Sequence, residues 1–106
     1  MICINYFWKN IFLESTNQKI SLENTNVSLY IKREDLLHPY VSGNKFRKLK
    51  YNLVQAKSEN KKTLLTFGGA FSNHILAVAA AGKAQGFKTI GIIRGEALKD
   101  KIAENP

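Results

Sequence analysis

Basic side chains crowd the segment HPYVSGNKFRKLKYNLVQAK (residues 38–57), and one of them, Lys45, occupies a position that could support chemistry. At about 100° per residue, a helix over this segment places Lys45 at the margin of an apolar stripe that contains Phe46, Leu49 and Leu53. A lysine directed towards an apolar interior tends to be paired, neutral or covalently used, because a desolvated ammonium is costly. A neutral amine at the mouth of a pocket is a nucleophile for aldehydes and can form a Schiff base.

The position of Lys45 also has a purely structural explanation. The side chain can bury its aliphatic stem at the edge of the stripe and keep the charged head in water. Arg47, Lys48 and Lys50 fall further from the stripe and are expected to be solvated. Helix geometry alone favours this structural explanation, because amphipathic lysines are common at such edges.

A second candidate site lies in TLLTFGGAFSNHILAVAAAG (residues 63–82). Here a strand leads into a turn opened by Gly68 and Gly69, and Ser72 and Asn73 begin a helix. Glycine lets the backbone approach a ligand closely, and the first N–H groups of a helix have no intrahelical partner, so a carboxylate or phosphate could bind. Alternatively, Ser72 or Asn73 is an ordinary N-cap. The segment lacks the P-loop, dinucleotide-turn and nucleophile-elbow patterns.

Metal chemistry, disulfides and membrane insertion find little support in the composition. His74 follows the turn, but one histidine without a second nearby ligand is poor evidence for a metal, so we assign none. The single cysteine, Cys3, allows no internal disulfide and suits a reducing cytoplasm, where we expect the protein to reside. We expect no signal peptide and no membrane span, because polar residues interrupt the apolar N-terminus and no later run is long enough.

The elements that must position these residues alternate between helix and strand. Alternating apolar residues predict a strand within residues 27–34, and Pro39 and Gly43 mark residues 35–43 as a loop. The remaining predictions are a helix from about Asn44 to about Lys57, a strand over residues 62–67, a helix over 74–85 and a strand over 88–95. This order predicts an α/β fold with a parallel βαβ arrangement.

Finer expectations concern the strands, one cap and the two ends. The strands over residues 62–67 and 88–95 are almost continuously apolar, a pattern typical of strands buried on both faces, and the two predicted helices are too few to cover both faces. Gly86 is predicted to be the C′ cap of the second helix. Residues 1–26 give the weakest pattern, and residues 96–106 either begin another helix or remain a loop.

The net charge of +8, from 16 basic and 8 acidic residues, makes a nucleic-acid surface worth considering. The lysines are spread from Lys9 to Lys101, however, and no DNA-binding or RNA-binding motif accompanies them. We therefore expect no nucleic-acid partner. A basic binding module without catalytic activity remains an alternative.

Four segments in order, IKREDLLHP, SGNKFRKL, TFGGAFSNH and GIIRG, resemble the N-terminal part of the 1-aminocyclopropane-1-carboxylate deaminase and D-cysteine desulfhydrase family. That family falls in the tryptophan-synthase-β-like group of pyridoxal-phosphate enzymes, called fold type II. The resemblance covers roughly residues 27–95. It implies a truncated, partial form of the parallel-sheet three-layer architecture, in which residues 1–106 are an N-terminal fragment of a two-domain enzyme. Residues 1–26 would precede a family-like βαβ region at 27–106.

The same resemblance assigns roles to four residues. Lys45 would hold pyridoxal 5′-phosphate as a Schiff base and take part in catalysis, and Asn73 would hydrogen-bond the 3′-oxygen of the cofactor. Ser72, Asn73 and His74 would receive the substrate carboxylate. Ser72 would also be a catalytic candidate for opening the cyclopropane ring. A histidine rather than a glutamine at position 74 favours the desulfhydrase branch.

The function implied is that of a pyridoxal-phosphate-dependent lyase, or a deaminase classed as a hydrolase, in amino-acid metabolism. Its substrate would be a small amino acid, either D-cysteine, with sulfide, pyruvate and ammonia as products, or 1-aminocyclopropane-1-carboxylate. The full-length form is expected to be a homodimer. The alternative is a catalytically incomplete fragment, because the cofactor's phosphate loop and the partner of its ring nitrogen are missing. We expect these 106 residues alone to be inactive and marginally stable, with apolar surface left exposed.

Overall fold

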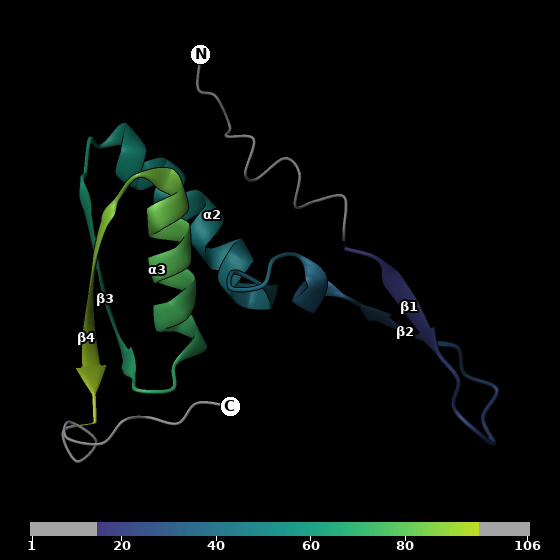
Figure 1. Cartoon of the computed structure of the whole chain (residues 1–106). Helices are drawn as coiled ribbons and strands as arrows, with labels where there is room; N and C mark the ends of the chain where they lie inside the picture. Colours follow the sequence, from purple (N-terminus) through teal and green to yellow (C-terminus); the bar gives the residue numbers. More distant parts are fainter. Residues whose placement is uncertain (1–14, 96–106) are drawn as a thin grey trace.

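The computed structural model describes residues 15–95. In chain order, the elements of this part are β1 (Asn17–Ile20), β2 (Leu29–Lys32), the 3₁₀ helix η1 (Glu34–Leu36), α2 (Gly43–Ser58), β3 (Thr63–Gly69), α3 (Asn73–Gln85) and β4 (Lys88–Arg94). Figure 1 shows the β1–β2 hairpin extending away from a body formed by α2, β3, α3 and β4. The expectations for residues 1–14 and 96–106 lie outside the described residues. Across residues 15–95, the helices are too short or too polar to cross a bilayer.

The predicted parallel βαβ arrangement is confirmed by β3, α3 and β4. The two strands pair in parallel from Thr63 opposite Lys88 to Gly69 opposite Arg94. Helix α3 returns along one face of this pair, as Figure 1 shows. The approach is close at Gly82, where an added Cβ would come within 2.3 Å of the Thr89 Cγ2 atom. The protein is therefore a mixed α/β protein with a parallel sheet.

The apolar core lies mainly between α2, α3 and the loop before α2. Its members are buried and apolar: Leu37, Val41, Phe46, Leu49, Leu53, Ala77, Val78, Ala81 and Phe87. The apolar stripe predicted for α2 is confirmed, because Phe46, Leu49 and Leu53 are its buried residues. On α3 the buried positions carry alanine, valine and glycine. These small side chains let α3 pack closely both on the sheet and on α2.

Helix α3 ends at the position that the sequence predicts. Gly86 has φ 76°, in the left-handed region where glycine carries no steric penalty. Its N–H donates to the Lys83 carbonyl, and the N–H of Phe87 donates to the Gly82 carbonyl at 2.9 Å. This cap turns the chain directly into β4.

The two parallel strands have the apolar pattern of strands buried on both faces, but within the described residues only one face of the pair is covered. On the face away from α3, Leu65 and Phe67 are 56% and 65% exposed, and Ile90 and Ile92 are also exposed. The reason is that α3 packs on one face of the sheet and α2 packs on α3, so the second face has no helix from residues 15–95. The expectation of exposed apolar surface is confirmed.

The hairpin is the element that the sequence predicted least well. The strand expected within residues 27–34 is β2, and it pairs antiparallel with β1 from Asn17 opposite Lys32 to Ile20 opposite Leu29. The β1 sequence NQKI shows no apolar alternation, so no strand was predicted there. All four residues of β2 are exposed, and hairpin formation therefore owes little to burial.

Candidate functional site

Lys45 and Asn73, from two different helices, line one hollow of about 350 Å³. The hollow is walled by the start of α2, the start of α3 and the loop between η1 and α2. Its lining residues are Asp35, Pro39, Tyr40, Ser42, Gly43, Asn44, Lys45, Asn73 and Leu76. We call it the Lys45 hollow. It brings together the two segments that the sequence singled out separately.

Burial alone does not distinguish Lys45 from the other basic residues of α2. Lys45 is half-buried, but so is Lys50, whose Nζ lies 5.4 Å from the centre of the Tyr51 ring. Lys48 is exposed. What separates Lys45 is its place in the lining of the hollow, where its Nζ donates a hydrogen bond to the Asn44 side-chain oxygen at 3.0 Å.

Both helices that border the hollow begin without a side-chain cap. Ser42 and Ser72 hold the N-cap positions of α2 and α3, and neither side chain makes a capping hydrogen bond. Ser72 thus stands at the predicted cap position without bonding the helix as a cap would. The positive ends of two helix dipoles border one hollow, which favours an anionic group there.

Ser72 and His74 are not among the residues that line the Lys45 hollow. The Ser72 Oγ lies over Gly68, where an added Cβ would come within 2.9 Å of it. The His74 Nε2 lies 2.9 Å from the hydroxyl of Thr66, a buried residue of β3. Of the three turn residues predicted for the site, the structure brings only Asn73 to the hollow.

Sequence reasoning missed Asp35, Tyr40 and Thr66. Asp35 lines the hollow, and its carboxylate accepts hydrogen bonds from Arg33, at 2.7 Å from Nη2 and 2.9 Å from Nε. These hydrogen bonds lower the pKa of Asp35 and keep it ionised. In the sequence, the charged run RED beside the predicted loop could have indicated Asp35. Thr66 could have been found because it places a hydroxyl group at an inward position of an otherwise apolar strand.

The loop that carries Tyr40 is shaped by a histidine. The His38 Nδ1 accepts hydrogen bonds from the backbone N–H groups of Tyr40 and Val41, both at 3.1 Å. Val41 is fully buried, whereas Tyr40 is exposed. His38 thus folds the chain so that one residue anchors in the core and its neighbour reaches the rim of the hollow.

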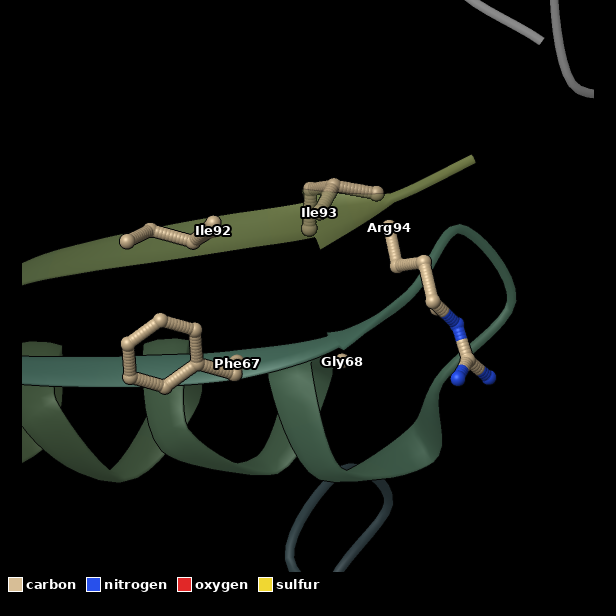
Figure 2. Close-up of a pocket in the computed structure, with 6 residues that line it drawn as sticks. Phe67, Gly68, Ile92, Ile93 and Arg94 are labelled. Carbon is tan, nitrogen blue, oxygen red and sulfur yellow. The ribbon is translucent and has the colours of Figure 1, made fainter. Parts of the chain in front are cut away.

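A second hollow, of about 390 Å³, lies at the carboxyl ends of the parallel strands. Figure 2 shows Phe67 of β3 beside Ile92 of β4, its partner in the register, and Arg94 at the end of β4. Gly68, Gly69 and Ile93 complete the lining. Gly68 and Gly69 of the predicted ligand turn thus line this second hollow, whereas Lys45, Ser72, Asn73 and His74 do not.

Comparison with known proteins finds relatives that are named for 1-aminocyclopropane-1-carboxylate deaminase. The 1-aminocyclopropane-1-carboxylate deaminase of Rhizobium rhizogenes is 44% identical over 63 residues, which cover 58% of this chain and 19% of the relative. The bifunctional D-cysteine desulfhydrase/1-aminocyclopropane-1-carboxylate deaminase, mitochondrial, of Arabidopsis thaliana is 43% identical over 53 residues, 50% of this chain and 13% of the relative. A Pyrococcus abyssi protein, provisionally named for the deaminase, is 41% identical over 70 residues, 66% of this chain and 21% of the relative.

The match thus spans about a fifth or less of the length of these curated relatives, in their N-terminal part. No family model and no solved structure matches the chain. The resemblance of the sequence to the deaminase and desulfhydrase family is confirmed over the matched segment.

Proposed function

We propose, from the confirmed resemblance to the 1-aminocyclopropane-1-carboxylate deaminase and D-cysteine desulfhydrase family, that this chain carries the lysine-bearing part of a pyridoxal-phosphate-dependent lyase or deaminase. The observation that supports this most is that Lys45 and Asn73 line one hollow. The resemblance implies contact with the cofactor for these two residues. The proposal includes the fold type II architecture. The parallel β3–β4 pair, with α3 on one face, is compatible with that architecture.

The residues of the Lys45 hollow fit such a cofactor. Its volume of about 350 Å³ falls within the range of small-molecule sites, roughly 300–1,000 Å³. Lys45 supplies a primary amine for the aldehyde group, and Asn73 supplies a carboxamide for an oxygen on the ring. The two uncapped helix starts add a positive potential that favours an anionic ligand.

Each residue of the proposed site then has a role in cofactor binding or catalysis. When bound, the cofactor supplies an electron sink for bond cleavage in an amino acid. Lys45 holds the cofactor covalently, and its freed amine removes or returns the proton at the substrate α-carbon. Asn73 orients the ring. The backbone N–H groups at the start of α3 receive the substrate carboxylate. The resemblance also implies this task for Ser72 and His74, although they do not line the hollow.

The proposed substrate is a small amino acid. D-cysteine and one water molecule would give sulfide, pyruvate and ammonia, and His74 favours this reaction over opening of the cyclopropane ring of 1-aminocyclopropane-1-carboxylate. A homodimeric and cytoplasmic enzyme is part of the same proposal. So is the prediction that residues 1–106 by themselves have little activity.

Chemical labelling tests the proposal. Incubation of the full-length form with pyridoxal 5′-phosphate, reduction with borohydride and peptide mass mapping should give one labelled lysine, Lys45. Lys48 and Lys50, in the same helix, serve as internal controls, and Lys45→Arg should abolish the label while keeping the charge. Asn73→Ala should reduce labelling and alter the visible absorbance, because a hydrogen bond to a charged group contributes about 1.5–3 kcal/mol. A label on Lys48 or Lys50 with Lys45 unmodified would refute the proposal.

A further inference from the structure

Glu34 in η1 and Arg47 in α2 form a two-point ion pair that lies outside the Lys45 hollow. The Arg47 Nε donates to the Glu34 Oε2 at 3.0 Å, and the Arg47 Nη2 donates to the Glu34 Oε1. Ser15 adds a longer hydrogen bond of 3.4 Å from its Oγ to the same Oε1. The Glu34 side chain is 21% exposed, less than that of Arg47 or of either partner in the Arg33–Asp35 pair. It is therefore the most sheltered member of these ion pairs.

The pair fixes the side of α2 that faces away from the hollow. Arg47 follows Lys45 by two residues, which places it roughly 200° around the helix from Lys45. Asp35, the neighbour of Glu34 in η1, lines the hollow. The ion pair thus joins the element that supplies one wall of the hollow to the helix turn that carries Lys45.

Apolar packing anchors this wall from the residue that follows η1. Leu37 and Val41, in the loop between η1 and α2, are buried in the core with Phe46. The η1 helix itself has no buried residue. The Glu34–Arg47 pair is a polar contact that orients η1 on α2, and a planar guanidinium fork restricts orientation more than a single hydrogen bond does.

We propose that Glu34 and Arg47 are positioning residues for the Lys45 hollow. They hold η1, and with it Asp35 and the loop to Tyr40, against the first turns of α2, so that the Lys45 amine keeps its place in the lining. This inference rests on the proposed function for the chemistry at Lys45. The geometric part, the ordering of the wall and of the helix start, can be measured without cofactor.

Exposed ion pairs contribute little to global stability. The proposal therefore predicts that loss of the Glu34–Arg47 pair changes the labelling of Lys45 but hardly changes the melting temperature. Glu34→Gln should leave the melting temperature nearly unchanged. The same variant should lower the ratio of Lys45 to Lys50 labelling by pyridoxal phosphate and borohydride roughly tenfold, because small misplacements of a reacting group have large effects on rate. A merely structural ion pair would not change this ratio.

Matched variants complete the labelling experiment. Glu59→Gln removes the carboxylate of the Lys61–Glu59 pair, 3.8 Å across, at the other end of α2, and should leave the ratio unchanged. Arg47→Lys keeps the charge but loses the fork, and should give an intermediate ratio. The exchanged pair Glu34→Arg with Arg47→Glu should recover much of the original selectivity.

Hydrogen exchange separates this inference from the proposed function. In Glu34→Gln without cofactor, the backbone amides of residues 40–46 should exchange faster, while those of residues 53–58 keep their rates. If the parent chain labels Lys45 no more than Lys50, the proposed function fails, and faster exchange at residues 40–46 still supports the positioning role. If Glu34→Gln has the parent's labelling ratio and the parent's exchange rates, the positioning role is overturned.

Discussion

The two strand pairs of this protein are held in place by different forces. The antiparallel pair β1–β2 exposes nearly all its residues and is held by ladder hydrogen bonds, which continue one step beyond the strands from the Arg33 N–H to the Thr16 carbonyl at 2.8 Å. The parallel pair β3–β4 carries α3 on one face, with small side chains in close contact. Burial therefore stabilises the parallel unit, whereas the hairpin depends on hydrogen bonds and ion pairs.

The Lys45 hollow lies at the boundary between these two differently stabilised regions. One wall, with Asp35 and Tyr40, follows the hairpin and is oriented by ion pairs. The other, with Lys45 and Asn73, begins the two helices of the apolar core. Only the η1 part of the first wall, which has no buried residue, can therefore move at little cost in global stability, because Leu37 and Val41 tie the rest of that wall to the core. Mutations in the two regions should therefore have different consequences.

Breaking the apolar region should have the largest effect. Phe46 is completely buried among the core residues of α2, α3 and the preceding loop. Phe46→Ala should reduce the free energy of unfolding by about 3–5 kcal/mol, since both apolar burial and packing are lost. Chemical denaturation followed by circular dichroism measures this. Tyr51→Ala, at an aromatic residue of the same helix that is 72% exposed, is the matched control and should change stability by less than about 0.5 kcal/mol. Equal effects of the two variants would contradict the assigned core.

The free energy of unfolding should fall by a smaller amount when an added side chain forces α3 away from the sheet. A Cβ at Gly82 would lie 2.3 Å from the Thr89 Cγ2 and 3.4 Å from the Leu64 Cδ1, so Gly82→Ala should cost about 1–3 kcal/mol. Gly69→Ala is the control, because no atom lies within 4 Å of the added Cβ. Thermal melts of both variants compare the two sites. A Gly82→Ala protein as stable as the parent would show that α3 and the sheet pack less closely than described.

The polar region should show the smallest effect on stability, visible as a dependence on pH. The hydrogen bond from Arg47 lowers the pKa of Glu34 below its ordinary value of 4.5. A carboxyl group whose pKa is lowered by folding stabilises the folded state above its unfolded pKa, and this contribution is lost as the pH falls through the folded pKa. The melting temperatures of the parent and Glu34→Gln should therefore differ slightly at pH 7 and converge as the pH falls through the lowered pKa of Glu34. A difference that grows on acidification would show that the Glu34 pKa is not lowered.

Much of the local structure was determined by the sequence itself. The spacing of Phe46, Leu49 and Leu53 predicts the buried face of α2, because a helix repeats every 3.6 residues and needs no distant partner to define its faces. Gly86 predicts the end of α3, because the left-handed conformation is easiest for glycine. The order of strands and helices predicts the parallel pairing. The motif segments of residues 27–95 carry the family resemblance.

Only the tertiary structure decided which residues share a site. It placed Asn73 beside the hollow of Lys45 and turned His74 towards Thr66, and no local pattern encodes either outcome. It also left one face of β3 and β4 open, although both strands are as apolar as strands buried on two faces. The physical reason is that periodicity and turn chemistry act over a few neighbouring residues. The contacts that form a hollow or cover a sheet join residues far apart in the chain, and their selection depends on the packing of whole elements.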